Sequence, residues 1–421
     1  MGKTFWFIVK AALSSAVSGF TAHKLAASAT TTQQLSRPAR FSLTGLASLA
    51  GLVYYSRVWV QDYYFDWSYR DNRDLTGRVA VVTGGTADGL GYAAAEILYR
   101  QGATVIVTVR TKEKGETAVR LLRASATPGG DDGENDGRAS YVICDFLSES
   151  SVRNCAAEIK RKTSEHGIDF LVLNAGISGG KATKQSGSND DSAGEEEREK
   201  ATKSAVAGVW MTNHVGPWIF ARELMPSLVR AARSNPNEHP RVVWVSSGAH
   251  KRSAIDWVNP FYPAKTFAGV TFSSYGQSKL ANIMHAREYQ KRVREMLLRN
   301  EGAASGGANA TATTDVKCFA LTPGAVLTNI IPKVSFLYPL FWVIMRSPEM
   351  GAQVIKMACL DNDLKGGEYL SNCQVKESLG AGGCSTDEEQ WKRLWELTEK
   401  QVEEKAYERF LESLDANKKT D

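Results

Sequence analysis

From about residue 75 onward, short apolar runs alternate with amphipathic stretches along the chain. Strands buried on both faces read as continuous β-branched runs, whereas helices repeat their apolar positions every three or four residues. RVAVVT (Arg78–Thr83) and TVIVTV (Thr104–Val109) are therefore predicted as strands, and Tyr92–Arg100 as the helix between them. Because strands that alternate with helices pair in parallel, the pattern predicts an α/β fold with a doubly wound parallel sheet.

The same pattern predicts four further strands and three further helices. The strands are Tyr141–Cys144, Asp169–Leu173, Val242–Val245 and Val316–Leu321; one helix carries Trp210–Phe220, one runs through Tyr275 to Arg299, and a long one spans 387–415. The last helix has an apolar stripe, and Thr386 with Glu389 can form its capping box. The stripe predicts packing on the domain or on a second copy in a homodimer.

Three polar segments interrupt the alternation, at 123–138, 179–204 and 302–314. They are rich in small or charged residues and carry too few apolar residues to bury a core. We expect surface insertions that need not fold.

Residues 1–61 differ in character, because they contain six Lys and Arg residues and no Asp or Glu. The stretch 41–60, FSLTGLASLAGLVYYSRVWV, is about long enough to span a bilayer, and aromatic residues gather at its far end as at a membrane interface. We expect a membrane anchor at 41–60, alone or as a hairpin with 5–27. A cleaved transit peptide and an amphipathic helix lying on the soluble domain are the alternatives.

Composition narrows the classes of function. The net charge of +5 is small for 421 residues, and no basic cluster with interleaved aromatic residues occurs, so nucleic acid is not expected as a partner. The six cysteines include no C-x-x-C pair, so neither a zinc site nor a disulfide framework is predicted, and a reducing compartment fits best. No metal-ligand spacing is present, and no metal is expected.

A glycine-rich turn, TGGTADGLG (83–91), joins the first predicted strand to the first helix. The backbone N–H groups of such a turn and the positive end of the helix dipole can hold a pyrophosphate. Gly85, Gly89, Leu90 and Gly91 are therefore candidate cofactor contacts, and the sheet is predicted to be of the Rossmann type. Asp88 is expected to cap the helix, since its carboxylate would otherwise lie beside phosphates.

Arg110 closes the second predicted strand, the place where a dinucleotide site recognises the adenosine ribose. A guanidinium there pairs with a 2′-phosphate, whereas an acid would accept a hydrogen bond from a 2′-hydroxyl. The sequence therefore predicts NADP(H) rather than NAD(H).

The stretch Ser274-Tyr275-Gly276-Gln277-Ser278-Lys279 places a lysine four residues after a tyrosine. On a helix the two side chains share one face, and an ammonium about 4 Å from a phenol favours the phenolate by roughly 4 kcal/mol at an effective dielectric near 20. This attraction would lower the Tyr275 pKa from about 10 to roughly 7. Taken alone, such a pair also arises by chance, and a solvated helix face is the alternative.

With these motifs in place, the chain resembles the short-chain dehydrogenase/reductase family over roughly residues 75–400. The glycine turn, Asn174-Ala175-Gly176, TNHVG, Ser246-Ser247, Tyr275 with Lys279, and Pro323-Gly324 occur in the family's order, while TNHVGPW, SSGAH, YGQSKLAN, SPEMGAQ and GGEYLSNC are most similar to the retinol-dehydrogenase-like branch. The resemblance implies a single catalytic domain at 75–400. An N-terminal anchor or targeting segment at 1–74 precedes it, and a charged helix end and tail at 401–421 follows.

The resemblance also implies a catalytic tetrad. Tyr275 would exchange a proton with the substrate oxygen, and Lys279 would lower the Tyr275 pKa and hold the nicotinamide ribose. Ser247 would stabilise the developing alkoxide, and Asn213 would hold a water that relays the proton. A strand-end capping serine and a structural helix asparagine are the alternatives for these two, although Ser246 is the expected cap.

Further positions follow from the same resemblance. Asp145 matches the acid near the adenine, Asn174 opens the turn that supports the sheet at the cofactor, and Pro323, Gly324 and Thr328 match the turn over the nicotinamide. His214 and His250 are expected to pack without a catalytic role. The apolar stretch Val334–Met345 is expected to roof a pocket, dip into a membrane surface or pack in the core.

These features predict an NADP(H)-dependent oxidoreductase that interconverts a lipophilic alcohol, such as a retinoid, steroid or other lipid-like molecule, with its aldehyde or ketone. The alternative is a catalytically idle NADP-binding scaffold whose acidic insertions recruit partners. The chain ends in Lys418-Lys419-Thr420-Asp421, which resembles a dilysine retrieval signal. We therefore expect an enzyme at the endoplasmic reticulum membrane with its active site facing the cytosol; a mitochondrial location is the alternative.

Overall fold

The computed structural model describes residues 48–58, 68–125, 137–178, 195–235, 238–263, 270–304, 315–327, 338–377 and 385–416. The chain divides into two compact units. The smaller unit combines Met1–Trp67 with Ile331–Arg346, and the larger one combines Ser68–Ile330 with Ser347–Asp421.

The larger unit is built on an eight-stranded sheet in the order β3-β2-β1-β4-β5-β6-β7-β8. Its strands are β1 (Val79–Thr83), β2 (Thr104–Val109), β3 (Ala139–Ile143), β4 (Phe170–Leu173), β5 (Arg241–Val245), β6 (Lys317–Thr322), β7 (Tyr369–Ser371) and β8 (Gln374–Lys376). All neighbours pair in parallel except β7 and β8, which are antiparallel. The predicted parallel α/β sheet is confirmed. Each predicted strand begins and ends within two residues of the corresponding observed strand.

The direction of strand addition reverses at the centre of the sheet. The chain runs from β1 outward to β2 and β3, then returns to place β4 on the other side of β1. In open α/β sheets the ligand crevice lies at such a reversal, beside the carboxyl ends of the strands. The glycine turn after β1 and the residues that follow β4 therefore border the expected crevice.

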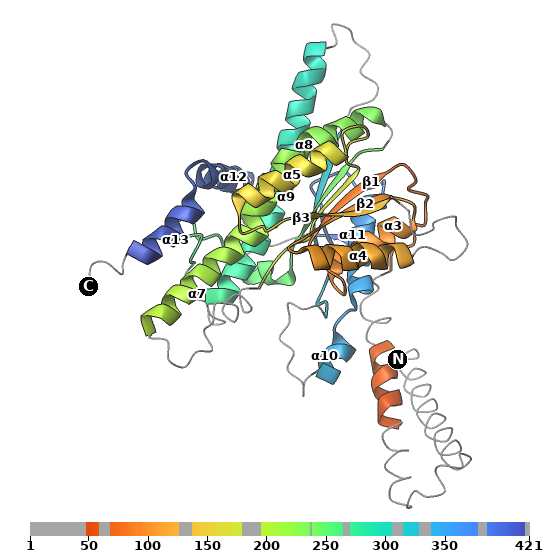
Figure 1. The fold of residues 1–421 in the computed structure, drawn as a ribbon, viewed down its shortest axis with the longest axis horizontal. Helices are drawn as coiled ribbons and strands as arrows, with labels where there is room; N and C mark the ends of the chain where they lie inside the picture. The colour runs from red at the N-terminus through yellow and green to blue at the C-terminus, as the bar shows by residue number, and fades with distance from the viewer. Residues whose placement is uncertain are drawn as a thin grey trace, which may run out of the picture. The chain divides into compact units, whose positions relative to one another are not determined.

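Helices cover both faces of this sheet (Figure 1). One face carries α3 (Leu90–Arg100), α4 (Lys112–Ala124) and α11 (Pro348–Leu360); the other carries α5 (Glu149–Lys162), α7 (Glu195–Trp210), α8 (Gly216–Ser234) and α9 (Val270–Ala304). Successive strand residues point to opposite faces, so Ala80 and Val82 enter one apolar core while Val81 enters the other. This double burial explains the continuous apolar run of β1.

Helix α7 begins at Glu195, so the last part of the segment 179–204, which was not required to fold, is helical. One prediction about helix limits is wrong. The predicted helix 387–415 is two helices, α12 (Glu388–Glu403) and α13 (Ala406–Ala416), because Lys405 between them has a left-handed backbone with φ 49°. The apolar stripe continues across this break, so periodicity alone did not reveal it.

Helix α12 packs on the domain, as its stripe predicted. Leu394 is fully buried, and Trp395 joins the core on the α9 side of the sheet. Its cap differs from the expected one, because the carboxylate of Asp387 accepts from the N–H groups of Glu389 and Gln390. The N-cap is therefore Asp387 and not Thr386.

A buried polar contact fixes the position of α12. The Thr398 hydroxyl donates to the Leu394 carbonyl at 2.8 Å and lies 3.0 Å from His214 Nε2 and 3.3 Å from His285 Nε2. Because its single proton is used, both imidazoles must donate to it. Burial lowers the pKa of His214 to about 3, so this ring is neutral, and it stacks on His285 at 4.6 Å. The expected packing role of His214 is confirmed.

The described part of the smaller unit consists of a helix at 48–58 and α10 (Tyr338–Ile344). The Arg57 guanidinium donates to the carbonyl oxygens of Trp342 and Met345, and it lies 4.5 Å from the centroid of the Trp342 ring. Among the described residues, no helix is long and apolar enough to cross a membrane. The remainder of 41–60, the stretch 5–27 and the residues Lys418–Asp421 lie outside the described residues.

Candidate active site

The glycine turn is held against the start of the loop after β4. Thr83 Oγ1 accepts from the backbone N–H groups of Asn174 and Ala175, each at 2.9 Å, and the Asn174 amide donates to the Thr83 carbonyl at 2.9 Å. A side chain at Gly91 would clash with this amide and with the Gly84 carbonyl. Asn174 therefore braces the turn, as the sequence predicted for the sheet-supporting position.

The helix that opens at this turn begins without a side-chain cap. Its N-cap is Gly89, which is extended at φ −103° and ψ 162° and has no side chain that could accept from the first N–H groups. The prediction that Asp88 caps α3 is wrong, because Asp88 has a left-handed backbone with φ 62° and an exposed side chain. The N–H groups at Leu90 and Gly91 are thus available to an anion, and Asp88 is in the solvent-exposed part of the turn.

Two side chains that the sequence assigned to the adenosine end lie at the same edge of the sheet. Arg110 follows β2 directly, is exposed, and forms no ion pair with any described residue. Asp145 follows β3 by one residue, is half-buried, and accepts from the Leu147 N–H at 3.1 Å. Since parallel strands present their carboxyl ends at one edge, Arg110 and Asp145 border the same side of the expected crevice.

Ser247, Tyr275 and Lys279 come together where β5 meets α9. The Ser247 hydroxyl lies near enough to the Tyr275 phenol to lower its pKa, and Lys279 Nζ lies 5.7 Å from the centroid of the tyrosine ring. Lys279 Nζ also donates to the Val245 carbonyl at 3.0 Å, and Ser246 Oγ donates to the Lys279 carbonyl at 2.7 Å. These contacts fasten the first part of α9 to the end of β5.

The expected fall of the Tyr275 pKa to about 7 is wrong for this state of the protein. Burial raises the pKa of Tyr275, and the hydrogen bond from Ser247 lowers it only in part. Lys279 is 4% exposed, and burial lowers its own pKa to about 8. Its ammonium is engaged by the Val245 carbonyl instead of lying against the phenol, so the assumed geometry does not occur.

Ser247 also caps the short 3₁₀ helix η4 (Gly248–Arg252), because its hydroxyl accepts from the Ala249 N–H at 3.3 Å. The expectation that Ser246 is the cap is wrong: its hydroxyl is directed to α9. Capping uses a lone pair of the Ser247 oxygen, so its proton is still available for donation toward Tyr275 or a substrate.

Asn213 lies in a π-helix, η3 (Met211–Val215), and is fully buried. Its Oδ1 accepts from the Ile177 N–H at 2.7 Å, and its Nδ2 donates to the Ile177 carbonyl at 2.9 Å and to Ser278 Oγ at 3.1 Å. Both amide protons are therefore committed to protein atoms. This geometry favours the structural alternative for Asn213, and it leaves one lone pair of Oδ1 for a water.

Gly176 shows how closely these groups approach. A Cβ at Gly176 would lie 3.1 Å from Asn213 Oδ1 and 3.3 Å from Lys279 Nζ. The absence of a side chain there lets the turn after β4 lie directly against both. The π-helix itself, a feature that recurs at functional sites, is invisible to a period-based analysis of the sequence.

The turn after β6 completes the edge of the site. Pro323 and Gly324 follow β6, and Gly324 needs its glycine because its φ is +84°. Thr328 lies outside the described residues.

One contributor was missed by sequence reasoning. Ser278 Oγ donates to the Tyr275 carbonyl at 2.7 Å while it accepts from Asn213, so it joins the π-helix to α9. The only available signal was its position, one residue before Lys279. His250 was expected to pack, and it is buried with its Nδ1 2.6 Å from the Ser247 carbonyl.

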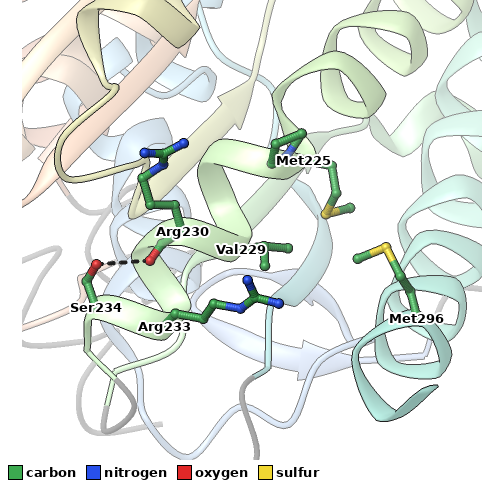
Figure 2. Close-up of a pocket in the computed structure, with 7 residues that line it drawn as sticks. Met225, Val229, Arg230, Arg233, Ser234 and Met296 are labelled. Carbon is green, nitrogen blue, oxygen red and sulfur yellow. Dashed lines mark hydrogen bonds between the residues drawn. The ribbon is translucent and has the colours of Figure 1, made fainter. Parts of the chain in front are cut away.

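A separate open groove of about 560 Å³ lies between α8 and α9, lined by Met225, Pro226, Val229, Arg230, Arg233, Ser234 and Met296. Figure 2 shows Met225 and Met296 directed toward one another from the two helices. These residues belong to the ends of α8 and α9 that lead into β5 and β6. The groove is therefore at the amino edge of the strands, away from Tyr275.

The burial of Lys279 predicts a measurable stability cost. A lysine whose pKa falls from 10.5 to about 8 on folding destabilises the native state by roughly 3 kcal/mol below pH 8. Between pH 8 and 10.5 the unfolded chain holds a proton that the folded chain has released, so stability rises with pH there. After subtracting about 1 kcal/mol for the lost hydrogen bond to Val245, Lys279→Met should raise the free energy of unfolding at pH 7 by about 2 kcal/mol.

Denaturant unfolding across pH 7 to 10.5 checks this expectation, with the exposed Lys392→Met as the control. The advantage of Lys279→Met should shrink as pH rises and vanish near the top of the range. A loss of stability at pH 7, or a difference that does not vary with pH, would contradict it.

Comparison with known proteins assigns this arrangement to a family. A family model described as short chain dehydrogenase matches residues 78–317. Dehydrogenase/reductase SDR family member 13 of Bos taurus is 31% identical over 369 residues, covering 85% of this chain and 81% of that protein; the Homo sapiens counterpart is 30% identical over 335 residues, covering 78% and 74%. Retinol dehydrogenase 14 of Mus musculus is 29% identical over 342 residues, covering 78% and 86%.

A solved structure of an uncharacterized protein from Mycobacterium paratuberculosis shares the fold, with a TM-score of 0.51 and 23% identity over 80% of this chain and 98% of that one. The match of the family model, which spans more than half of the chain, agrees with the glycine turn at β1 and with the Ser247, Tyr275 and Lys279 cluster. The chain belongs to the short-chain dehydrogenase/reductase family, is similar to retinol dehydrogenases, and is an oxidoreductase that acts on CH–OH groups with a nicotinamide cofactor.

Proposed function

We propose that this enzyme uses NADP(H) to interconvert a lipophilic alcohol with its aldehyde or ketone. The observation that carries the proposal is the neighbouring pair of hydroxyls, Ser247 and Tyr275, with the buried Lys279 ammonium beside the tyrosine ring. Two hydroxyls that can donate to one oxygen suit a carbonyl that becomes an alkoxide.

The residues at the carboxyl edge of the sheet fit a dinucleotide. The uncapped start of α3 offers N–H groups to a pyrophosphate, Arg110 suits a 2′-phosphate, and Asp145 borders the adenosine side. The turn at Pro323 and Gly324 would lie over the nicotinamide, with Lys279 on the ribose. When bound, the nicotinamide supplies or accepts the hydride.

The protein groups would handle the proton. At neutral pH Tyr275 retains its proton, because burial raises its pKa. A protonated phenol donates to the strongly basic alkoxide that a reduced carbonyl becomes, and Ser247 stabilises the same oxygen by donating a hydrogen bond. The same phenol gives its proton in reduction and takes it back in oxidation.

An idle scaffold is the weaker alternative, for a physical reason. A protein that only binds a nucleotide could use the buried Lys279 ammonium to hold the ribose, but it gains nothing from placing the Ser247 hydroxyl beside the Tyr275 phenol, and burying that ammonium costs stability at neutral pH. Sites that tolerate such a cost are commonly catalytic.

The lipophilic character of the substrate is supported by two observations. Relatives of this chain carry the name retinol dehydrogenase, and the apolar helix α10, YPLFWVI, follows the Pro323-Gly324 turn in the chain. We further propose that residues 41–60 hold the enzyme to the endoplasmic reticulum membrane with its active site facing the cytosol, where unpaired cysteines such as Cys144 and Cys318 stay reduced.

Replacing the proposed proton donor tests the activity. Tyr275→Phe should lower NADPH-dependent reduction of retinal or a long-chain aldehyde at least about 100-fold, because proton transfer is lost. NADPH affinity, measured by fluorescence titration, should change little, since the phenol acts on the substrate. Tyr141→Phe on β3 is the matched control and should stay active; retention of more than about a tenth of the activity by Tyr275→Phe would exclude the proton-transfer role.

The choice of cofactor rests on Arg110. A charge-assisted pair with the 2′-phosphate is typically worth about 1.5–3 kcal/mol, or roughly 10- to 150-fold in affinity. Arg110→Asp should therefore reverse a preference for NADPH into one for NADH, as measured by the dissociation constants of both. Arg120→Asp, at an exposed position of α4, makes the same charge change and should leave the preference intact. Equal binding of the two cofactors by the wild-type enzyme would refute the assignment.

A further inference from the structure

The smaller unit joins two segments that lie far apart in the sequence. Arg57, on the helix at 48–58, and Trp342, on α10, are separated by 285 positions and meet in direct contact. The first segment belongs to the N-terminal apolar region, and the second follows the Pro323-Gly324 turn of the active site in the chain. The Arg57 contact therefore joins the N-terminal apolar region to the segment that follows this turn in the chain.

Arg57 is the one charged residue between positions 41 and 60. Its guanidinium has interaction partners within the smaller unit. The guanidinium donates to the carbonyl oxygens of Trp342 and Met345, the latter at 3.2 Å, and lies over the Trp342 ring. These carbonyls are at the carboxyl end of α10, where the helix dipole is negative. A guanidinium with these partners is far less costly to place in an apolar medium than an unpaired one.

The outer surface of the two helices is apolar. Leu49, Leu52 and Tyr54 are 57%, 50% and 55% exposed, and Ile344 of α10 is 42% exposed. Both helices thus present large apolar side chains to their surroundings. Residues 1–61 carry six positive charges and no negative one, which complements an anionic lipid surface.

We propose that the helix at 48–58 and α10 insert together into an anionic phospholipid bilayer, with Arg57 as the latch that holds α10 to the anchor. The segment that follows the nicotinamide turn in the chain is then held at the bilayer in which a lipophilic substrate dissolves. The inference rests on the proposed function for its substrate, and on the contacts of Arg57 for its geometry.

Environment-sensitive dyes on the full-length protein test the joint insertion. In a background where Cys373 and Cys384 are replaced by Ser, a dye is attached to Leu52→Cys, to Ile344→Cys, or to Val258→Cys, which is 94% exposed on the larger unit. Vesicles of phosphatidylcholine and phosphatidylserine should shift the emission to the blue at positions 52 and 344 and leave position 258 unchanged.

Each other outcome has a defined meaning. A shift at 52 alone would overturn joint insertion while the proposed anchor stands. A shift at neither position would overturn both, but it would leave the Tyr275 and Arg110 tests of the oxidoreductase untouched. A shift at 344 that grows with protein concentration in the absence of vesicles would assign the face to a second copy of this chain and overturn the proposal.

The latch has its own variant. Arg57→Leu should keep the response at 52, lose most of the response at 344, and lower turnover of a vesicle-borne long-chain aldehyde about tenfold, the value of one such cation–π and hydrogen-bonded contact. Turnover of a short water-soluble aldehyde should not change. Arg40→Leu removes the same charge from the basic N-terminal region and should leave the response at 344 intact. An unchanged response at 344 in Arg57→Leu would contradict the latch.

Discussion

The buried ammonium of Lys279 is the constraint on which the site depends. It lies between the end of β5 and α9. Lys279 Nζ donates a hydrogen bond to the Val245 carbonyl, and Ser246 Oγ donates one to the Lys279 carbonyl, so the helix is fixed to the strand. That attachment places Tyr275 next to Ser247. The parallel sheet makes the arrangement possible, because it brings the carboxyl ends of β1, β4, β5 and β6 to one edge.

A second set of contacts surrounds this point. Asn213 and Ser278 connect the π-helix, the loop after β4 and α9. The hydroxyl of Thr398 on α12 accepts hydrogen bonds from His285 and from His214, which is next to Asn213 in the chain. Helix α12 is therefore part of the scaffold behind the site. The two buried imidazoles need the Thr398 hydroxyl, since an unpaired imidazole N–H in this core would cost about 1–3 kcal/mol of stability.

Much of the fold was predictable because its signals are local. Continuous β-branched runs marked the strands, and the glycine turn, Tyr275 with Lys279, and Ser247 were found from motif order. Features that depend on backbone conformation were missed: the left-handed residues Asp88 and Lys405 displaced a cap and split a helix, and nothing in TNHVG predicts a π-helix.

The pKa of Tyr275 was mispredicted for a related reason. The spacing of Tyr275 and Lys279 gives a shared helix face, but desolvation depends on the tertiary surroundings, which a spacing does not contain. The contact of Arg57 with Trp342 is equally non-local, since no pattern links positions 285 residues apart.

Transfer of an isotopic label tests the central claim most directly. The wild-type enzyme is incubated at neutral pH with NADPH deuterated at the nicotinamide C4 and with a long-chain aldehyde or retinal in phospholipid vesicles, and the product is analysed by mass spectrometry. The account predicts an alcohol that carries one deuterium on its carbinol carbon, formed faster than with equally deuterated NADH. An alcohol without the label, or no alcohol from any of these lipophilic carbonyl compounds, would contradict it.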